Sequence, residues 1–139
     1  MKQMLTVCAL LTFLTGCGTK VESPQVTPVS GQVRYRGELL TSGSITFIPP
    51  NESSNRPAIA TIDKNGQFKL SSFKAGDGVA PGEYRVVISS LLSGPDIDNP
   101  GVPEVSAIPK KYSSIETTNL TATIPDGEKK MEFTFDLVD

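Results

Sequence analysis

Cys17 is the residue whose type and position most clearly indicate a chemical reaction. It ends the sequence Leu14-Thr15-Gly16-Cys17, and the mostly apolar run 4–14 follows the single positive charge of Lys2. A basic start, a short apolar run and small residues before a cleavage point are the pattern of a secretory signal peptide. A membrane-spanning helix needs about 20 apolar residues. We therefore expect residues 1–16 to be a signal peptide that is removed.

A cysteine directly after these small residues resembles the lipobox of bacterial lipoproteins. The resemblance implies that the Cys17 sulfur receives a diacylglycerol, that the chain is cut before Cys17, and that the new amine is acylated, for example with palmitate. It predicts an extracytoplasmic protein of the bacterial cell envelope, bound to a membrane through its lipid. Cys8 leaves with the signal peptide, so the mature chain has neither a free thiol nor a disulfide.

The residue types that the sequence lacks restrict the remaining chemistry. The chain has no His, which excludes a Ser-His-Asp triad, a Cys-His pair and a His-ligated zinc site. With Cys17 alkylated, thiolate chemistry is excluded as well. Hydrolysis by a carboxylate pair, a Ser-Lys dyad or a metal held by oxygen ligands remains possible.

The charge balance gives no reason to expect a nucleic-acid partner. The formal net charge of the chain is −2, and it becomes −3 when Lys2 is removed with residues 1–16. Such a balance attracts neither nucleic acid nor anionic lipid. Attachment to a membrane must therefore depend on the lipid at Cys17.

Asp96, Asp98 and Glu104 are the best candidates for carboxylate chemistry, in the Pro-rich stretch 91–114. A glycosidase needs two carboxyl groups about 5–9 Å apart, and the same oxygens could bind calcium weakly. Both functions require the three side chains to converge in one pocket. Two other polar stretches are interpreted as structural: 63–66 (DKNG) as a hairpin turn, and 74–78 (KAGDG) as a loop tip.

Carbohydrate binding is a further alternative that depends on aromatic side chains. The chain has no Trp and three Tyr residues. The alternation of apolar residues predicts that Tyr35 and Tyr84 point inward, with the Tyr84 hydroxyl bonded to the backbone as in a tyrosine corner. Tyr112 is then the one ring that is expected to be exposed beside polar groups.

Most of the chain has the pattern of β-strands that would position these side chains. Residues 17–28 are polar, contain two prolines and are predicted to be the lipidated N-terminus and flexible tether. Residues 29–139 are predicted to form one domain. Apolar residues alternate with polar ones in seven segments, which lie near residues 29–36, 45–47, 58–62, 68–70, 83–89, 120–124 and 133–137.

About seven short strands with frequent turn signals predict an all-β fold, an antiparallel β-sandwich of the immunoglobulin-like or transthyretin-like kind. A small barrel is the alternative. The turn 63–66 is expected to close one hairpin, and Pro125-Asp126-Gly127 is expected to pair 120–124 with 133–137. Residues 91–114 are expected to be free of strands, with one helical turn at 110–112 that places Tyr112 on the edge of the sandwich.

Several motifs occur in the order found in carboxypeptidase regulatory-like domains, which are transthyretin-like sandwiches. The chain resembles this family from about residue 29 to residue 123, through VSGQV at 29–33, GELL at 37–40, SITF at 44–47, ATIDKNGQF at 60–68 and PGEYRV at 81–86. Residues 108–112 and 118–121 are similar to a bacterial lipoprotein subgroup of that family. The resemblance implies a structural or adhesive domain that has no catalytic residues and needs no cofactor or metal.

The sequence therefore predicts a lipid-anchored, non-catalytic structural or protein-binding module of the cell envelope. Cys17 is the single residue for which it predicts a specific chemical role, and an unidentified envelope protein is the expected partner. The alternatives are a carbohydrate-binding or calcium-binding domain, or a carboxylate-based hydrolase.

Overall fold

The computed structural model describes residues 18, 24–50, 53 and 55–139. The predictions for Cys17 and for residues 1–16 lie outside the described residues. Within the described part of the chain, no helix is long and apolar enough to cross a membrane.

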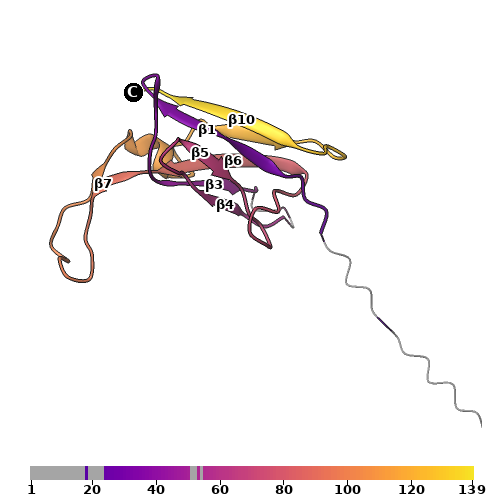
Figure 1. Cartoon of the computed structure of the whole chain (residues 1–139), viewed down its shortest axis with the longest axis horizontal. Coiled ribbons are helices and arrows are strands. Elements are labelled where there is room, and N and C mark those ends of the chain that lie inside the picture. Colours follow the sequence, from indigo (N-terminus) through magenta and orange to yellow (C-terminus); the bar gives the residue numbers. More distant parts are fainter. Residues whose placement is uncertain (1–17, 19–23, 51–52, 54) are drawn as a thin grey trace, which may run out of the picture.

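Two four-stranded β-sheets form the body of the molecule (Figure 1). The first sheet contains β1 (Val29–Tyr35), β2 (Glu38–Leu39), β5 (Gln67–Lys69) and β10 (Met131–Leu137). The second has the order β4-β3-β6-β9, and its strands are β3 (Ser44–Ile48), β4 (Ala58–Thr61), β6 (Gly82–Ser89) and β9 (Thr121–Ile124). The remaining elements are a two-stranded ribbon of β7 (Leu91–Ser93) and β8 (Val105–Ser106), and the short 3-10 helix η1 (Lys110–Ser113).

The all-β sandwich predicted from the sequence is confirmed, and each of the seven predicted segments forms a strand. β6 illustrates why: Tyr84, Val86 and Ile88 are buried, whereas the alternate residues Glu83 and Arg85 are exposed. The prediction that 91–114 contains no strand is wrong, because β7 and β8 lie within it. Strands of two or three residues are too short to produce a recognisable alternation.

The first and last strands, β1 and β10, pair in parallel, with Val29 opposite Met131 and Tyr35 opposite Leu137. The predicted hairpin between 120–124 and 133–137 is therefore wrong. β9 pairs with β6 in the second sheet, and the chain crosses to the first sheet before β10 begins. Alternation identifies the inward face of a strand, but it does not identify the sheet to which the strand belongs.

The turn at 63–66 is confirmed, although the strands that it joins separate. Asp63 accepts hydrogen bonds from the backbone amides of Asn65 (2.7 Å) and Gln67 (3.0 Å). Gly66 has φ +72°, a conformation that glycine adopts without steric cost. β4 pairs with β3 and β5 pairs with β1, so beyond the turn itself the two arms are linked by the isolated bridge between Ile59 and Ser71.

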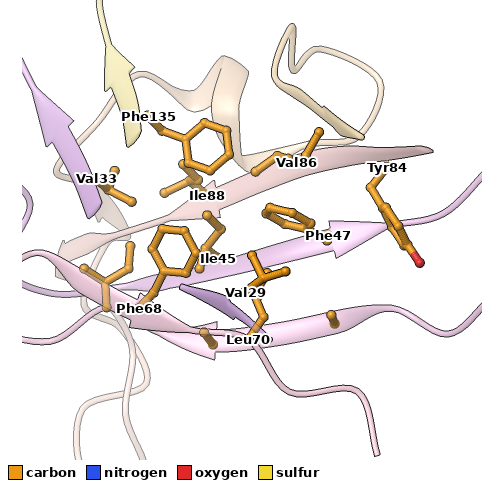
Figure 2. Close-up of a cluster of buried hydrophobic side chains, with 14 of the residues drawn as sticks. Val29, Val33, Ile45, Phe47, Phe68, Leu70, Tyr84, Val86, Ile88 and Phe135 are labelled. Carbon is orange, nitrogen blue, oxygen red and sulfur yellow. The ribbon is translucent and has the colours of Figure 1, made fainter. Parts of the chain in front are cut away.

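The core lies between the two sheets and contains side chains from both (Figure 2). Phe47 on β3 makes edge-to-face contacts with Phe133 and Phe135 on β10, with ring centroids 5.7 and 6.1 Å apart. Phe135 also stacks on Phe68 of β5, on the other side of β1 in the same sheet. Edge-to-face aromatic pairs contribute about 0.5–1.5 kcal/mol beyond the burial of their area, so these contacts help to hold the sheets together.

Gly31 lies where β1 is flanked by β10 on one side and β5 on the other. A side-chain carbon at this position would overlap the backbone carbonyl of Phe133 and would lie 2.7 Å from the ring of Phe68. The glycine of the VSGQV motif therefore permits the close approach of three strands.

We expect Gly31→Ala to lower the free energy of unfolding by about 1–3 kcal/mol, because the added methyl group overpacks the β1–β10 interface. Urea unfolding of the purified domain measures this. Ser30→Ala on the same strand is the control and should change stability by no more than about 0.5 kcal/mol. Alanine favours a strand more than glycine does, so a Gly31→Ala protein that is more stable than wild type would show that the close approach is not present.

Candidate functional site

A groove of about 830 Å³ lies on the outer face of the second sheet. Its floor includes Ile48, Arg85 and Thr121, which lie in one row across β3, β6 and β9. Pro49 and Pro50, together with residues 115–116, also line it. Open hollows with a mixture of apolar and polar groups are the usual sites of reversible binding.

Arg85 connects this groove to the loop that follows η1. Its guanidinium donates to the carbonyl oxygens of Ile115 (3.2 Å) and Thr118 (3.3 Å). The buried Thr118 hydroxyl donates to the Val86 carbonyl (2.7 Å). The exposed Glu116 accepts from the Ser114 hydroxyl, and this hydrogen bond lowers the pKa of the Glu116 carboxyl. Glu83, Arg85 and Glu116 are open to solvent, which suits contact with a polar ligand better than a reaction that must exclude water.

The three carboxylates predicted for hydrolysis or calcium binding do not gather into one metal site. Asp96 accepts from the backbone amides of Asp98 (2.9 Å) and Asn99 (2.7 Å), so it closes a turn of its own loop. Asp98 and Glu104 are exposed. Among the described residues, no three Asp, Glu or Cys side chains lie close enough to hold a metal ion. Asp96 is therefore engaged in its own turn, and the other two carboxylates face solvent.

Asp77, in the Gly-rich stretch 74–78, has a structural role that the sequence did not reveal. Its carboxylate accepts hydrogen bonds from the backbone amides of Ser72 (2.8 Å), Phe73 (3.0 Å) and Lys74 (2.9 Å). Partial burial opposes its ionisation, but these hydrogen bonds outweigh that effect and lower the Asp77 pKa below the ordinary value of 3.8. The loop is organised around this one side chain.

The prediction that Tyr112 is an exposed platform for carbohydrate is wrong. Helix η1 places the ring in the core, where it is 2% exposed. Its hydroxyl donates to the carbonyl of Val138 (2.9 Å) and accepts from the Val138 amide (3.1 Å). Tyr84 is buried as predicted and donates to the carbonyl of Ala80 (2.8 Å). Tyr35 is half-buried, and its hydroxyl bonds the exposed carboxylate of Asp139 (2.6 Å).

The sequence analysis missed the ribbon that β7 and β8 form together with the loop between them. This ribbon, residues 91–106, extends away from the sandwich (Figure 1). Five of its apolar side chains are among the most exposed large hydrophobic groups of the described chain: Leu91, Leu92, Ile97, Val102 and Val105. The signal in the sequence is a set of aliphatic residues among prolines and acids that follows neither strand nor helix periodicity.

Comparison with known proteins gives little beyond this description. No family model matches the sequence. No curated protein matches it either. Among solved structures, a 9R-lipoxygenase from Cyanothece PCC8801 matches with 15% sequence identity and a TM-score of 0.43. The match covers 86% of this chain and 17% of the lipoxygenase chain.

We expect Tyr112→Phe to lower the free energy of unfolding by about 1–3 kcal/mol, because it leaves the amide and carbonyl of Val138 without their partner. Urea unfolding measures the loss. Tyr35→Phe removes a hydroxyl from the surface and should have a smaller effect. Equal effects of the two variants would contradict the buried position of Tyr112.

We expect Asp77→Asn to lower the free energy of unfolding at pH 7 by about 1 kcal/mol, because a neutral amide accepts the three backbone hydrogen bonds less strongly. The folded-state pKa of Asp77 lies below the ordinary value of 3.8. Its contribution is therefore fully present well above pH 3.8 and is lost as the pH falls through the folded-state pKa.

Urea unfolding from pH 7 to strongly acidic pH, compared between wild type and Asp77→Asn, measures this dependence. The difference in stability should narrow below pH 3.8. Asp136→Asn, at an exposed position of β10, is the control and should show little difference at any pH. A difference for Asp77→Asn that is constant with pH would contradict the proposed role of its charge.

Proposed function

We propose that the chain is a lipoprotein of the bacterial cell envelope, anchored through acyl chains on Cys17. Its β-sandwich then serves outside the cytoplasm as a non-catalytic structural or protein-binding module. The sequence motifs that resemble carboxypeptidase regulatory-like domains support the same class of module. The lipobox supports the anchoring.

The placement of the two ends of the sandwich carries the proposal. Thr27 forms a bridge with Val79, and its hydroxyl donates to the carbonyl of Glu128 (3.2 Å), next to the start of β1. The β7–β8 ribbon extends from the opposite end (Figure 1). Nine residues, 18–26, lie between Cys17 and Thr27, so the extended chain between these two residues spans at most about 36 Å. In this proposal the anchored end and the ribbon are therefore at opposite ends of the sandwich.

The lipid must supply the affinity for the membrane in this proposal. One acyl chain binds a bilayer with an association constant of order 10⁴ M⁻¹, or about 5 kcal/mol. Two or three chains make release negligible. The formal charge of −3 without residues 1–16 contributes no attraction to anionic lipid.

A protein-binding module is favoured over the alternatives by the positions of their key residues. A carbohydrate platform at Tyr112 is opposed by the burial of that ring. A calcium site or a carboxylate hydrolase is opposed by the use of Asp96 in its own turn. The exposed aliphatic side chains of the ribbon favour contact with a macromolecule.

We expect Cys17→Ser to abolish lipidation, because a hydroxyl does not replace the thiol that receives the diacylglycerol. Labelling of cells with radioactive palmitate, fractionation of membranes and intact-mass measurement test this. The variant should carry no label and should be absent from the fraction that is processed and lipid-bound.

Cys8→Ser is the matched control, because it removes the other thiol from the part of the chain that is cut off. It should be labelled, processed and membrane-bound like wild type. A Cys17→Ser protein that is still processed and carries label would show that the lipid is attached to another residue.

A further inference from the structure

The ribbon 91–106 exposes aliphatic side chains where the fold does not require them. Leu92 is 74% exposed and Ile97 is 100% exposed, and Leu91, Val102 and Val105 also face solvent. Single exposed aliphatic residues are ordinary on protein surfaces, whereas a group of them on one projecting element indicates an interaction site. None of these five side chains belongs to the core between the sheets.

The ribbon has a defined shape, which reduces the entropy lost when it binds. Its base is joined to the sandwich, because the Ala107 amide and the Ser106 hydroxyl both donate to the carbonyl of Ser90, at 2.8 and 3.2 Å. Its tip is closed by the carboxylate of Asp96. Three prolines between them, Pro95, Pro100 and Pro103, restrict the backbone. A pre-ordered loop gains affinity because fewer conformations are lost on binding.

The charges on the ribbon decide which kind of surface it fits. Residues 90–109 contain three acidic side chains and no Lys, Arg or His. Two copies of the ribbon would bring like charges together, and an anionic lipid surface would repel it. A basic surface is complementary to these acidic side chains.

We propose that the ribbon 91–106 docks on another protein, in an apolar cleft bordered by Lys or Arg side chains. Leu92 and Ile97 enter the cleft, and Asp98 and Glu104 face the basic border. The Asp96 carboxylate accepts backbone hydrogen bonds in the turn at the tip and so maintains the shape of the ribbon. The inference rests on the proposed function for its setting outside the cytoplasm, and it names the chemistry of the partner.

Site-specific photo-crosslinking with the full chain in the bacterium that produces it tests this proposal. A photoreactive benzoylphenylalanine is placed at position 92 or 97, and at the exposed position 129 between β9 and β10 as the control. Positions 92 and 97 should give one discrete protein adduct, at least tenfold more abundant than any adduct from position 129. Mass spectrometry of the adduct should identify a partner peptide that lies beside Lys or Arg.

Substitutions separate the apolar contribution from the charged one. Leu92→Ser should lower the adduct formed from position 97 more than tenfold, whereas Ile59→Ser, which changes an exposed aliphatic residue on β4, should leave it unchanged. Asp98→Asn combined with Glu104→Gln should lower it severalfold. All of these side chains are exposed, so the unfolding midpoints of the purified variants should equal that of wild type.

Several results would overturn the proposal. These are equal adducts from positions 92 and 129, an adduct with lipid or with a second copy of the chain, no adduct at all, or an adduct insensitive to Leu92→Ser or to the charge variant. The lipid on Cys17 is measured by mass in the same cells. A lipidated chain without a ribbon adduct refutes the ribbon alone, and an unlipidated chain with the adduct refutes the anchor alone.

Discussion

The parallel pairing of β1 with β10 is the contact on which the rest of the domain depends. It joins Val29 to Met131 and Tyr35 to Leu137, residues about a hundred positions apart in the chain. The loop-closure entropy of such a contact is large, so it must be supported by the side chains that it brings into the core. A shift of one residue would turn Phe135 and Leu137 to the solvent face of β10. The contacts of Phe47 with β10 therefore fix the register as well as the distance between the sheets.

The same pairing positions features that lie outside the two sheets. It carries the chain beyond β10 to Val138, whose amide and carbonyl hold the hydroxyl of Tyr112. Tyr112 in turn fixes η1 and the loop that lines the outer groove. At the other end of β1, the pairing places Thr27 beside Glu128. The approach of the chain to the sandwich and the position of η1 are thus consequences of one non-local contact.

The sequence predicted the strands well because alternation reports burial directly, and it predicted the 63–66 turn because Asp63 and Gly66 have local roles. It did not predict which strands pair. The inward faces of β9 and β10 have the same pattern whether the two strands are neighbours or lie in opposite sheets. Tyr112 was misplaced for a related reason: its partner, Val138, lies 26 residues away. The role of Asp77 was missed because its carboxylate accepts from backbone amides three to five residues earlier in the chain, whereas the recognisable turn signature, as at Asp63, involves amides that follow the acid.

The candidate site was the least predictable part, because the sequence directs attention to residues that could do chemistry. Asp96, Asp98 and Glu104 have suitable groups, but Asp96 closes a turn in a ribbon that also exposes five aliphatic side chains. In the proposed function, the sandwich separates the lipid anchor at Cys17 from the ribbon that is proposed to bind a partner. β6 alone spans eight residues, or about 26 Å at the usual rise of a strand, and it connects the end where the tether arrives to the end where the ribbon begins. If the chain is anchored at Cys17 as proposed, this strand sets the distance along the sandwich between the anchored end and the ribbon.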